Sequence, residues 1–260
     1  MKLTKCIVIG AILGAAVLAQ GPPPHGRGFG PAFGPGMGPH GGKVVKGVPY
    51  SADVTSTRVE TLADGNTIQQ TVTGKVARDS EGRTYSIETS TGGPLGQTGP
   101  VTRIAIFDPV AGYAYELNQT TKTATRRAVH LPSANASARD GGERKERGPS
   151  AVKTDLGTST VSGVGATGTM TTRTIPAGAI GNTNPIISTS ETWYSTELET
   201  VVASKHSDPR AGQMNYSLSN IVRGEPSAAL FQVPAGYTVT DAPKGRGQFE
   251  HRGPPPPPEE

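Results

Sequence analysis

Gly (35 residues) and Pro (23 residues) make up 22% of this 260-residue chain, against about 12% in an average protein. The excess is local, because residues 21–42 hold 15 of these Gly and Pro residues and residues 43–240 are only 16% Gly and Pro. The chain has no strict Gly repeat and only one Cys, which excludes a collagen and a disulfide-rich scaffold. The formal net charge is +4, without a basic stripe interleaved with aromatic residues, so a nucleic-acid-binding protein is not expected.

The first 19 residues have the pattern of a secretory signal peptide. Lys2 and Lys5 accompany an apolar run, Cys6–Leu18, and Ala19 is a small residue before a cleavage site at Gln20. The run is shorter than the roughly 20 residues that span a bilayer. We therefore predict an exported protein, periplasmic or extracellular, with no stable membrane anchor after cleavage. The cleaved chain would have no Cys and a net charge of +2.

Two segments that flank the centre of the chain lack any hydrophobic period. Residues 20–42 are rich in Gly and Pro, and residues 241–260 include five consecutive prolines, 254–258. Such segments bury too little apolar surface to offset the entropy lost on ordering. The expected organisation is a signal peptide (1–19), a disordered linker, one antiparallel β domain (43–240) and a disordered Pro-rich tail.

The central region is predicted to consist of antiparallel strands. Segments rich in Thr and in alternating apolar residues are separated by turn signals, of which Asp64-Gly65 is the strongest. In the second strand, we expect Ile68, Val72 and Val76 to share one face. The expected strands cover residues 51–62, 67–78, 83–89, 102–107, 113–117, 121–129, 151–162, 165–175, 186–194, 200–207 and 215–222.

One short helix is expected near the C-terminus, at Pro226–Phe231, where Pro occupies the first helical position. Several strands are polar on both sides, as in Thr167–Thr174, whereas a closed sandwich needs two apolar inner faces. The sequence therefore predicts an all-β fold with minor α content. A curved antiparallel sheet or half-barrel meander of about ten strands is favoured over a compact sandwich.

The sequence contains the blocks Thr61–Asn66, Arg78–Arg83, Gly165–Asn182, Glu191–Leu198, Ser204-Lys205, Ser207–Arg210, Tyr216–Ile221, Gly224–Pro226 and Leu230–Tyr237. These blocks resemble segments of a family of uncharacterised exported bacterial β-rich proteins. The ending, a Trp/Tyr strand, two further strands and then Leu-Phe-x-x-Pro-x-x-Tyr, is also distantly similar to the lipoprotein-carrier (LolA-like) superfamily of the bacterial envelope. That resemblance implies a curved half-barrel sheet. Carriers of this kind bury acyl chains beneath helices on the concave face, and this chain departs from that pattern because only one short helix is predicted.

No metal site, cofactor site or catalytic group is predicted. Only His130 and His206 of the five histidines lie between the tails, far apart in sequence and without metal-ligand spacing. His206 and Asp208 would share a face of a strand, but Asp208 begins turn chemistry at Pro209. A Gly-x-Ser-x-Gly nucleophile motif is absent. We therefore expect a protein that is not an enzyme.

The large aromatic residues are the candidates for ligand binding, although they also suit a hydrophobic core. The acids Glu191, Glu197 and Glu199 near two of them leave a carbohydrate-active enzyme as one alternative. A structural or surface scaffold with flexible tails is another. The leading hypothesis is a non-enzymatic domain that binds an apolar ligand or an envelope protein. The candidate binding residues are Phe107, Tyr113, Tyr115, Trp193, Tyr194 and Phe231.

Overall fold

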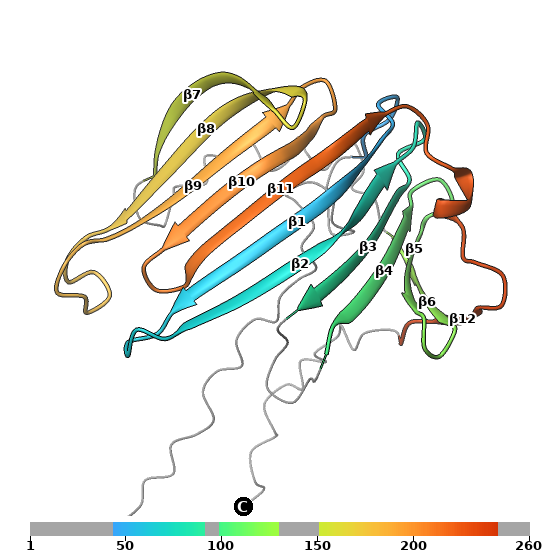
Figure 1. The fold of residues 1–260 in the computed structure, drawn as a ribbon, viewed down its shortest axis with the longest axis horizontal. Helices are drawn as coiled ribbons and strands as arrows, with labels where there is room; N and C mark the ends of the chain where they lie inside the picture. The colour runs from blue at the N-terminus through green and yellow to red at the C-terminus, as the bar shows by residue number, and fades with distance from the viewer. Residues whose placement is uncertain (1–43, 92–98, 130–150, 244–260) are drawn as a thin grey trace, which may run out of the picture. The chain divides into compact units, whose positions relative to one another are not determined.

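The computed structural model describes residues 44–91, 99–129 and 151–243, which form twelve strands and a short 3-10 helix, η1 (Ala228–Phe231; Figure 1). The predicted signal peptide, the linker and most of the predicted tail lie outside the described residues. The strands are β1 (Tyr50–Thr61), β2 (Thr67–Arg78), β3 (Thr84–Thr91), β4 (Val101–Asp108), β5 (Tyr113–Asn118), β6 (Thr123–Ala128), β7 (Ala151–Val161), β8 (Val164–Ile175), β9 (Ile186–Ser195), β10 (Thr200–Asp208), β11 (Gly212–Arg223) and β12 (Thr238–Asp241).

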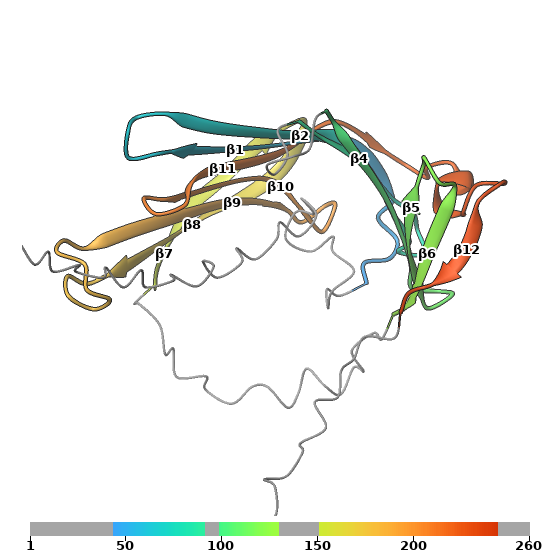
Figure 2. The same ribbon diagram turned by 90° about the horizontal axis from the view of Figure 1, so that it is seen from below.

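All twelve strands belong to one sheet, in the order β12-β6-β5-β4-β3-β2-β1-β11-β10-β9-β8-β7. Strands β1 to β6 form one antiparallel meander and β7 to β11 a second, and the pairing of β1 with β11 joins the two. The sheet is open, with β7 and β12 at its edges, and it curves along the strand order (Figure 2). The predicted curved antiparallel sheet is therefore confirmed.

Strand β12 is the element that the sequence did not predict, and the sheet has twelve strands rather than about ten. It pairs in parallel with β6, from Thr238 opposite Thr123 to Asp241 opposite Arg126. All four of its residues are exposed, so its sequence lacks the apolar alternation from which a strand is predicted. The predicted short helix is present as the 3-10 turn η1, and it begins two residues later than expected.

The hairpin of β1 and β2 follows from its turn. The Gly65 amide donates to the Leu62 carbonyl (2.9 Å), and the Asn66 amide donates to Asp64 Oδ1 (2.9 Å). Gly65 has φ +84°, a conformation that favours glycine. The turn sets an unbroken register from Thr61 opposite Thr67 to the far end of both strands.

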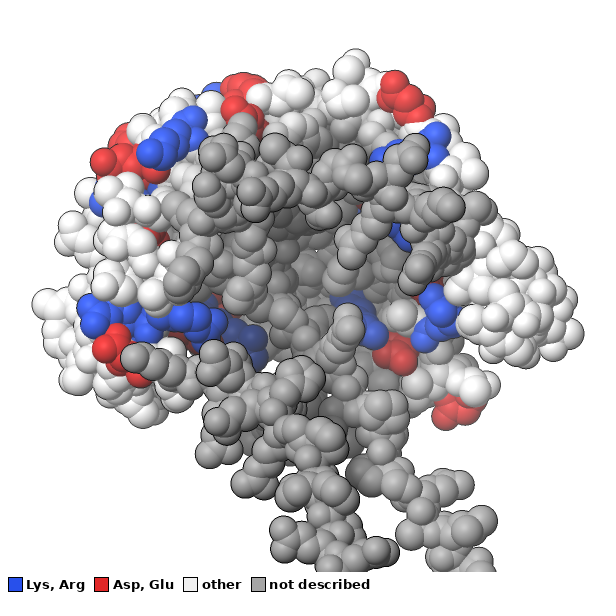
Figure 3. Space-filling view, turned by 180° about the vertical axis from the view of Figure 1, so that it is seen from behind, with Lys and Arg blue, Asp and Glu red and all other residues white. Residues whose placement is uncertain are grey.

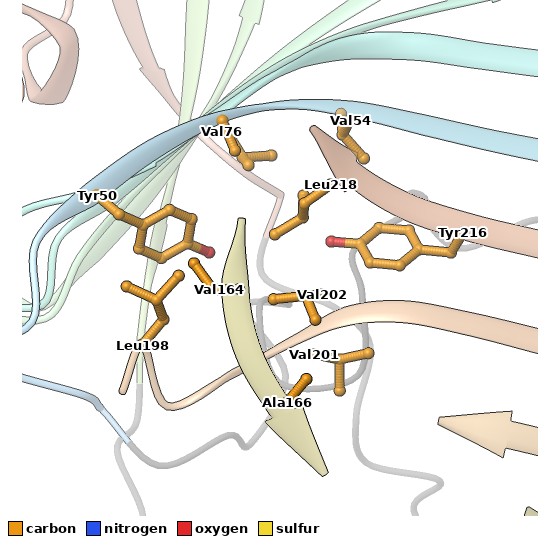
Figure 4. Packing of buried hydrophobic residues seen from close by; sticks show 11 residues of the cluster. Tyr50, Val54, Val76, Val164, Ala166, Leu198, Val201, Val202, Tyr216 and Leu218 are labelled. Carbon is orange, nitrogen blue, oxygen red and sulfur yellow. The ribbon is translucent and has the colours of Figure 1, made fainter. Parts of the chain in front are cut away.

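One face of the sheet carries a cluster of buried apolar residues that we call the concave cluster. Figure 4 shows its side chains directed toward one another from strands on both sides of β1 and β11. Valine side chains of the cluster are at most 5% exposed, so this part of the core is fully packed. The concave cluster consists of Tyr50, Ala52, Val54, Val76, Val164, Ala166, Leu198, Val201, Val202, Tyr216 and Leu218.

A second apolar cluster, the convex cluster, lies on the opposite face, over β3 to β6. Val76 of the concave cluster pairs with Ser86 of β3, so the neighbouring Tyr85 and Ile87 point to the other face. The chain after η1 covers this second face and lies outside the curve of the sheet (Figure 2). The convex cluster consists of Ile104, Ile106, Leu117 and Ala124, with Tyr85, Ile87, Tyr115, Val233 and Tyr237 packed against it.

The tip of the β7–β8 hairpin closes one end of the concave face. Ser162 Oγ donates to the Leu218 carbonyl (2.5 Å), and Arg223 Nη2 donates to the Gly163 carbonyl (3.2 Å). Arg223 also forms an ion pair with Glu197, in the turn between β9 and β10. These contacts hold the tip against β11, so that Val164 of β8 is buried among the residues of the concave cluster.

The concave cluster occupies only one end of the strands that form it. Ile68, Val72 and Val76 share one face of β2 as predicted, because their partners in β1 are all alternate residues. Val76 is 3% exposed, whereas Ile68 is 45% exposed at the far end of the strand. No helix among residues 44–91, 99–129 and 151–243 has the length and apolar character to cross a membrane.

Candidate functional site

The candidate aromatic residues do not gather at one place. Tyr113 and Tyr115 lie on the convex face of β5, with ring centroids 6.3 Å apart, and Tyr115 packs against the convex cluster. The guanidinium of Arg126 stacks over the Tyr113 ring at 4.8 Å. Phe231 of η1 is 4% exposed, and Arg83 lies over its ring at 5.4 Å. These three aromatics therefore stabilise the outer side of the sheet.

The remaining three candidates are also separated. Phe107 pairs with Thr84 and Ala114, which places it on the concave face of β4. Trp193 packs at the border of the concave cluster, and its indole Nε1 donates to Glu191 Oε1 (2.6 Å). Tyr194 is 40% exposed. The six residues thus line no common cavity, and their role in ligand binding stays a prediction.

A row of hydroxyl groups crosses the concave face beyond the concave cluster. Ser56 of β1 and Ser204 of β10 both face Tyr216 of β11. Ser204 is in turn paired with Thr192 of β9. Three neighbouring strands, β1, β11 and β10, therefore present a hydroxyl at the same level of the concave face. Hydroxyls both donate and accept hydrogen bonds, so the row suits a polar ligand surface.

Burial keeps the Tyr216 hydroxyl in its neutral form. Tyr216 is 6% exposed, and desolvation is the main cause of a pKa raised above the ordinary value of a tyrosine, with Tyr50 and Glu88 acting in the same direction. Burial likewise raises the pKa of Tyr50. Both side chains therefore keep a proton to donate at physiological pH.

The next row of the concave face is more open and more varied. Met214 of β11 faces Arg58 of β1 on one side and His206 of β10 on the other. His206 also faces Ser190 of β9, which faces Thr171 of β8. The Met214 side chain is 42% exposed. Together with Ile68, this row gives the open half of the concave face exposed apolar groups among polar and cationic ones.

The convex side of the same strands is polar and solvated. Thr55 of β1 faces Thr73 and Ser217, and Asn215 faces Lys205. Elsewhere on β1, the carboxylate of Asp53 accepts hydrogen bonds from Lys75 Nζ (2.8 Å) and from Asn220 Nδ2 (2.7 Å). In the middle of these strands, the exposed Met214 side chain therefore lies on the concave side. Figure 3 views that side, and at its visible rim Lys and Arg lie beside Asp and Glu.

The acids weighed for catalysis are engaged in local contacts. Asp208 lies on the face of His206, but it accepts from Arg210 Nε (3.0 Å) and Nη2 (2.8 Å). Those hydrogen bonds are the main cause of an Asp208 pKa lowered to about 2. Glu191 accepts from Trp193, and the pKa of Glu197 is lowered by its hydrogen bond to Arg223. Asp208, Glu191 and Glu197 thus each have a structural partner.

Metal ligation finds no support in the part of the chain that the structure describes. No group of three or more His, Cys, Asp or Glu residues there could hold a metal ion. Met214 and Arg58 belong to no sequence motif, so the sequence does not predict them as site residues. One signal could have located Arg58. Tyr50, Ala52 and Val54 alternate in β1, and this alternation marks the face to which Arg58 also belongs.

Comparisons with known proteins leave the family open. No family model matches the chain, and no curated protein matches it. Among solved structures, MucB in complex with MucA matches with 11% identity and a TM-score of 0.38, over 72% of this chain and 55% of that one, so the chain spans little more than half of MucB.

Two further structures match over more of their length. An uncharacterised conserved protein from Thermus thermophilus has 9% identity and a TM-score of 0.41, over 75% of this chain and 90% of that one. A LolA superfamily protein from Nitrosomonas europaea has 9% identity and a TM-score of 0.30, over 71% and 90%. The LolA superfamily thus appears among the solved structures that the chain matches, at 9% identity.

Proposed function

We infer that this chain is an exported, non-enzymatic binding domain that holds a partner protein on the open half of its concave face. The observation that carries this proposal is the contrast between the two halves of that face. One half is filled by the concave cluster, and the other leaves Met214 and Ile68 exposed beside the hydroxyl row. The predicted leader, residues 1–19, supports export to the periplasm or beyond.

The packed half argues against an acyl chain as the ligand. Val164 and Leu198, from the β7–β8 tip and the β9–β10 turn, are 1% and 3% exposed within the concave cluster. A lipid would therefore have to displace side chains that the protein already buries. Burial of such a side chain contributes about 1.5–3 kcal/mol, so the displacement would be costly.

The open half has the character of a protein interface. Met and Arg are enriched in such interfaces, and Met214 and Arg58 both belong to this half. The flexible thioether of Met214 can adapt to a partner's apolar side chain. The hydroxyl row can donate to or accept from a partner's backbone. A surface of this mixed kind fits a polypeptide better than a purely apolar molecule.

Site-specific photocrosslinking tests this proposal. We expect Met214→p-benzoylphenylalanine, in the full chain expressed in its own bacterium, to yield an adduct with another polypeptide. The control is Asn215→p-benzoylphenylalanine, one residue along β11 and on the convex face, which should yield none. Mass spectrometry of the adducts would identify their composition. Equal adducts at both positions, or a lipid adduct at position 214, would contradict the proposal.

A further inference from the structure

Strand β7 (Ala151–Val161) forms one edge of the sheet. Its inner side pairs with β8, and no described strand pairs with its outer side. From Ala151 to Asp155 the pairing is regular, and a bulge between Asp155 and Gly157 then interrupts it, with Gly157 at φ +74°. An edge strand presents unpaired amide and carbonyl groups to which another strand can add. The regular segment is therefore a short template for strand addition.

The charges on this segment favour one particular partner. Lys153 and Asp155 are two residues apart, so they share a face of the strand, and both are exposed. Neither forms an ion pair with a described residue. A Lys on an edge strand usually discourages pairing. Here, a partner strand with an acidic residue opposite Lys153 and a basic residue opposite Asp155 would form two favourable opposite-charge pairs.

We propose that β7 pairs antiparallel with β7 of a second copy of this chain, about a two-fold axis at Thr154. In this register Lys153 of each copy faces Asp155 of the other, so the axis generates two opposite-charge pairs. A register centred on Lys153 or on Asp155 would instead place like charges opposite each other, which is destabilising. The charge pattern thus selects both the partner and the register.

Apolar residues on the other face of β7 fit the same register. Val152 is 61% exposed, and the Thr154-centred register, continued to the bulge, brings it toward Leu156 of the second copy. Leu156 and the indole of Trp193 both lie against Gly168, each within 2.9 Å of where a Cβ on that glycine would lie. Pairing would therefore extend an apolar strip across the axis. A two-fold contact of this kind is closed, so association would stop at the dimer.

Charge reversal tests the proposed pairing. In analytical ultracentrifugation of the full-length protein, we expect the unaltered chain to dimerise. Lys153→Glu or Asp155→Lys alone should raise the dissociation constant about tenfold or more, because each places like charges opposite one another twice. The double variant Lys153→Asp with Asp155→Lys should regain the original constant. The control Lys46→Glu makes the same charge change on an exposed residue outside the sheet and should change nothing.

A monomer at every concentration would overturn the proposal, as would a double variant as weak as the single ones. A cysteine pair tests the register itself, in a Cys6→Ser background. Residues on the axis have Cα atoms about 4.5–5.5 Å apart, within reach of a disulfide. Thr154→Cys should therefore form a disulfide-linked dimer under mild oxidation, and Val152→Cys should form no disulfide between copies. Cross-linking at 152 and not at 154 would also overturn the register.

Discussion

Gly74→Ala is expected to lower the free energy of unfolding by about 3 kcal/mol, because the strands leave no room for a Cβ at this position. A Cβ on Gly74 would lie 1.9 Å from the Ile87 carbonyl oxygen and 2.9 Å from the Glu88 Cα, both of them backbone atoms of β3. A backbone atom cannot rotate away as a side chain can. The β2–β3 pairing would have to open at the position where Gly74 faces Glu88, near the centre of the sheet.

Urea denaturation of the purified variant measures this loss. The matched control is Gly165→Ala in β8, where no atom lies within 4 Å of the added Cβ and φ is outside the left-handed region. That substitution should leave stability within about 0.5 kcal/mol of the unaltered chain. If Gly74→Ala were as mild as the control, β2 and β3 could not approach each other as closely as they do in this structure.

Arg78→Met is expected to lower the free energy of unfolding by a similar amount, about 3 kcal/mol. Arg78 is 4% exposed, and its guanidinium donates to the carbonyls of Val48 (3.0 Å) and Leu198. The same group lies over the Tyr50 ring at 4.9 Å. A Met side chain fills similar space but has no hydrogen-bond donor, so the carbonyls of Val48 and Leu198 would lose this donor. The cation–π contact would also be lost.

Arg78 contacts two regions that lie far apart in the sequence. They are the chain at Val48 and Tyr50, where β1 begins, and the turn between β9 and β10 at Leu198, and Arg78 holds them together at the closed end of the concave face. Burial lowers the pKa of its guanidinium, as expected for a cation held among neutral carbonyls. Thermal unfolding compares Arg78→Met with Arg127→Met, which removes an exposed cation of β6 and should be nearly neutral. Equal melting temperatures for both variants would mean that Arg78 does not stabilise the closed end of the concave face.

Much of the fold was predictable because turn chemistry is local. Asp64-Gly65 defines a tight turn, and the strand predicted after it, residues 67–78, has the bounds of β2. Thr-rich alternation then located most other strands to within one or two residues. Strand β12 was not predictable in this way, because its four exposed residues carry no alternation and its parallel partner, β6, lies more than a hundred residues earlier.

The candidate site was harder to predict, because periodicity assigns residues to a face without saying which face of the sheet it is. Tyr85 and Ile87 of β3 alternate as regularly as Val54 and Val76 do in β1 and β2, yet they belong to the convex cluster. The aromatic residues therefore looked like one group in the sequence and occupy both faces in the structure. The neighbours of a residue such as Met214 are known only from the cross-strand register, which the sequence alone does not specify.

Native mass spectrometry of the exported protein, purified without detergent, tests the central claim most directly. That claim is that the packed half of the concave face is closed by the chain's own Val164 and Leu198 and holds no lipid. The predicted result is the mass of the polypeptide alone, as a monomer or a whole-number oligomer. A stoichiometric added mass that fragments to acyl chains would contradict the claim and make the concave cluster a lipid site.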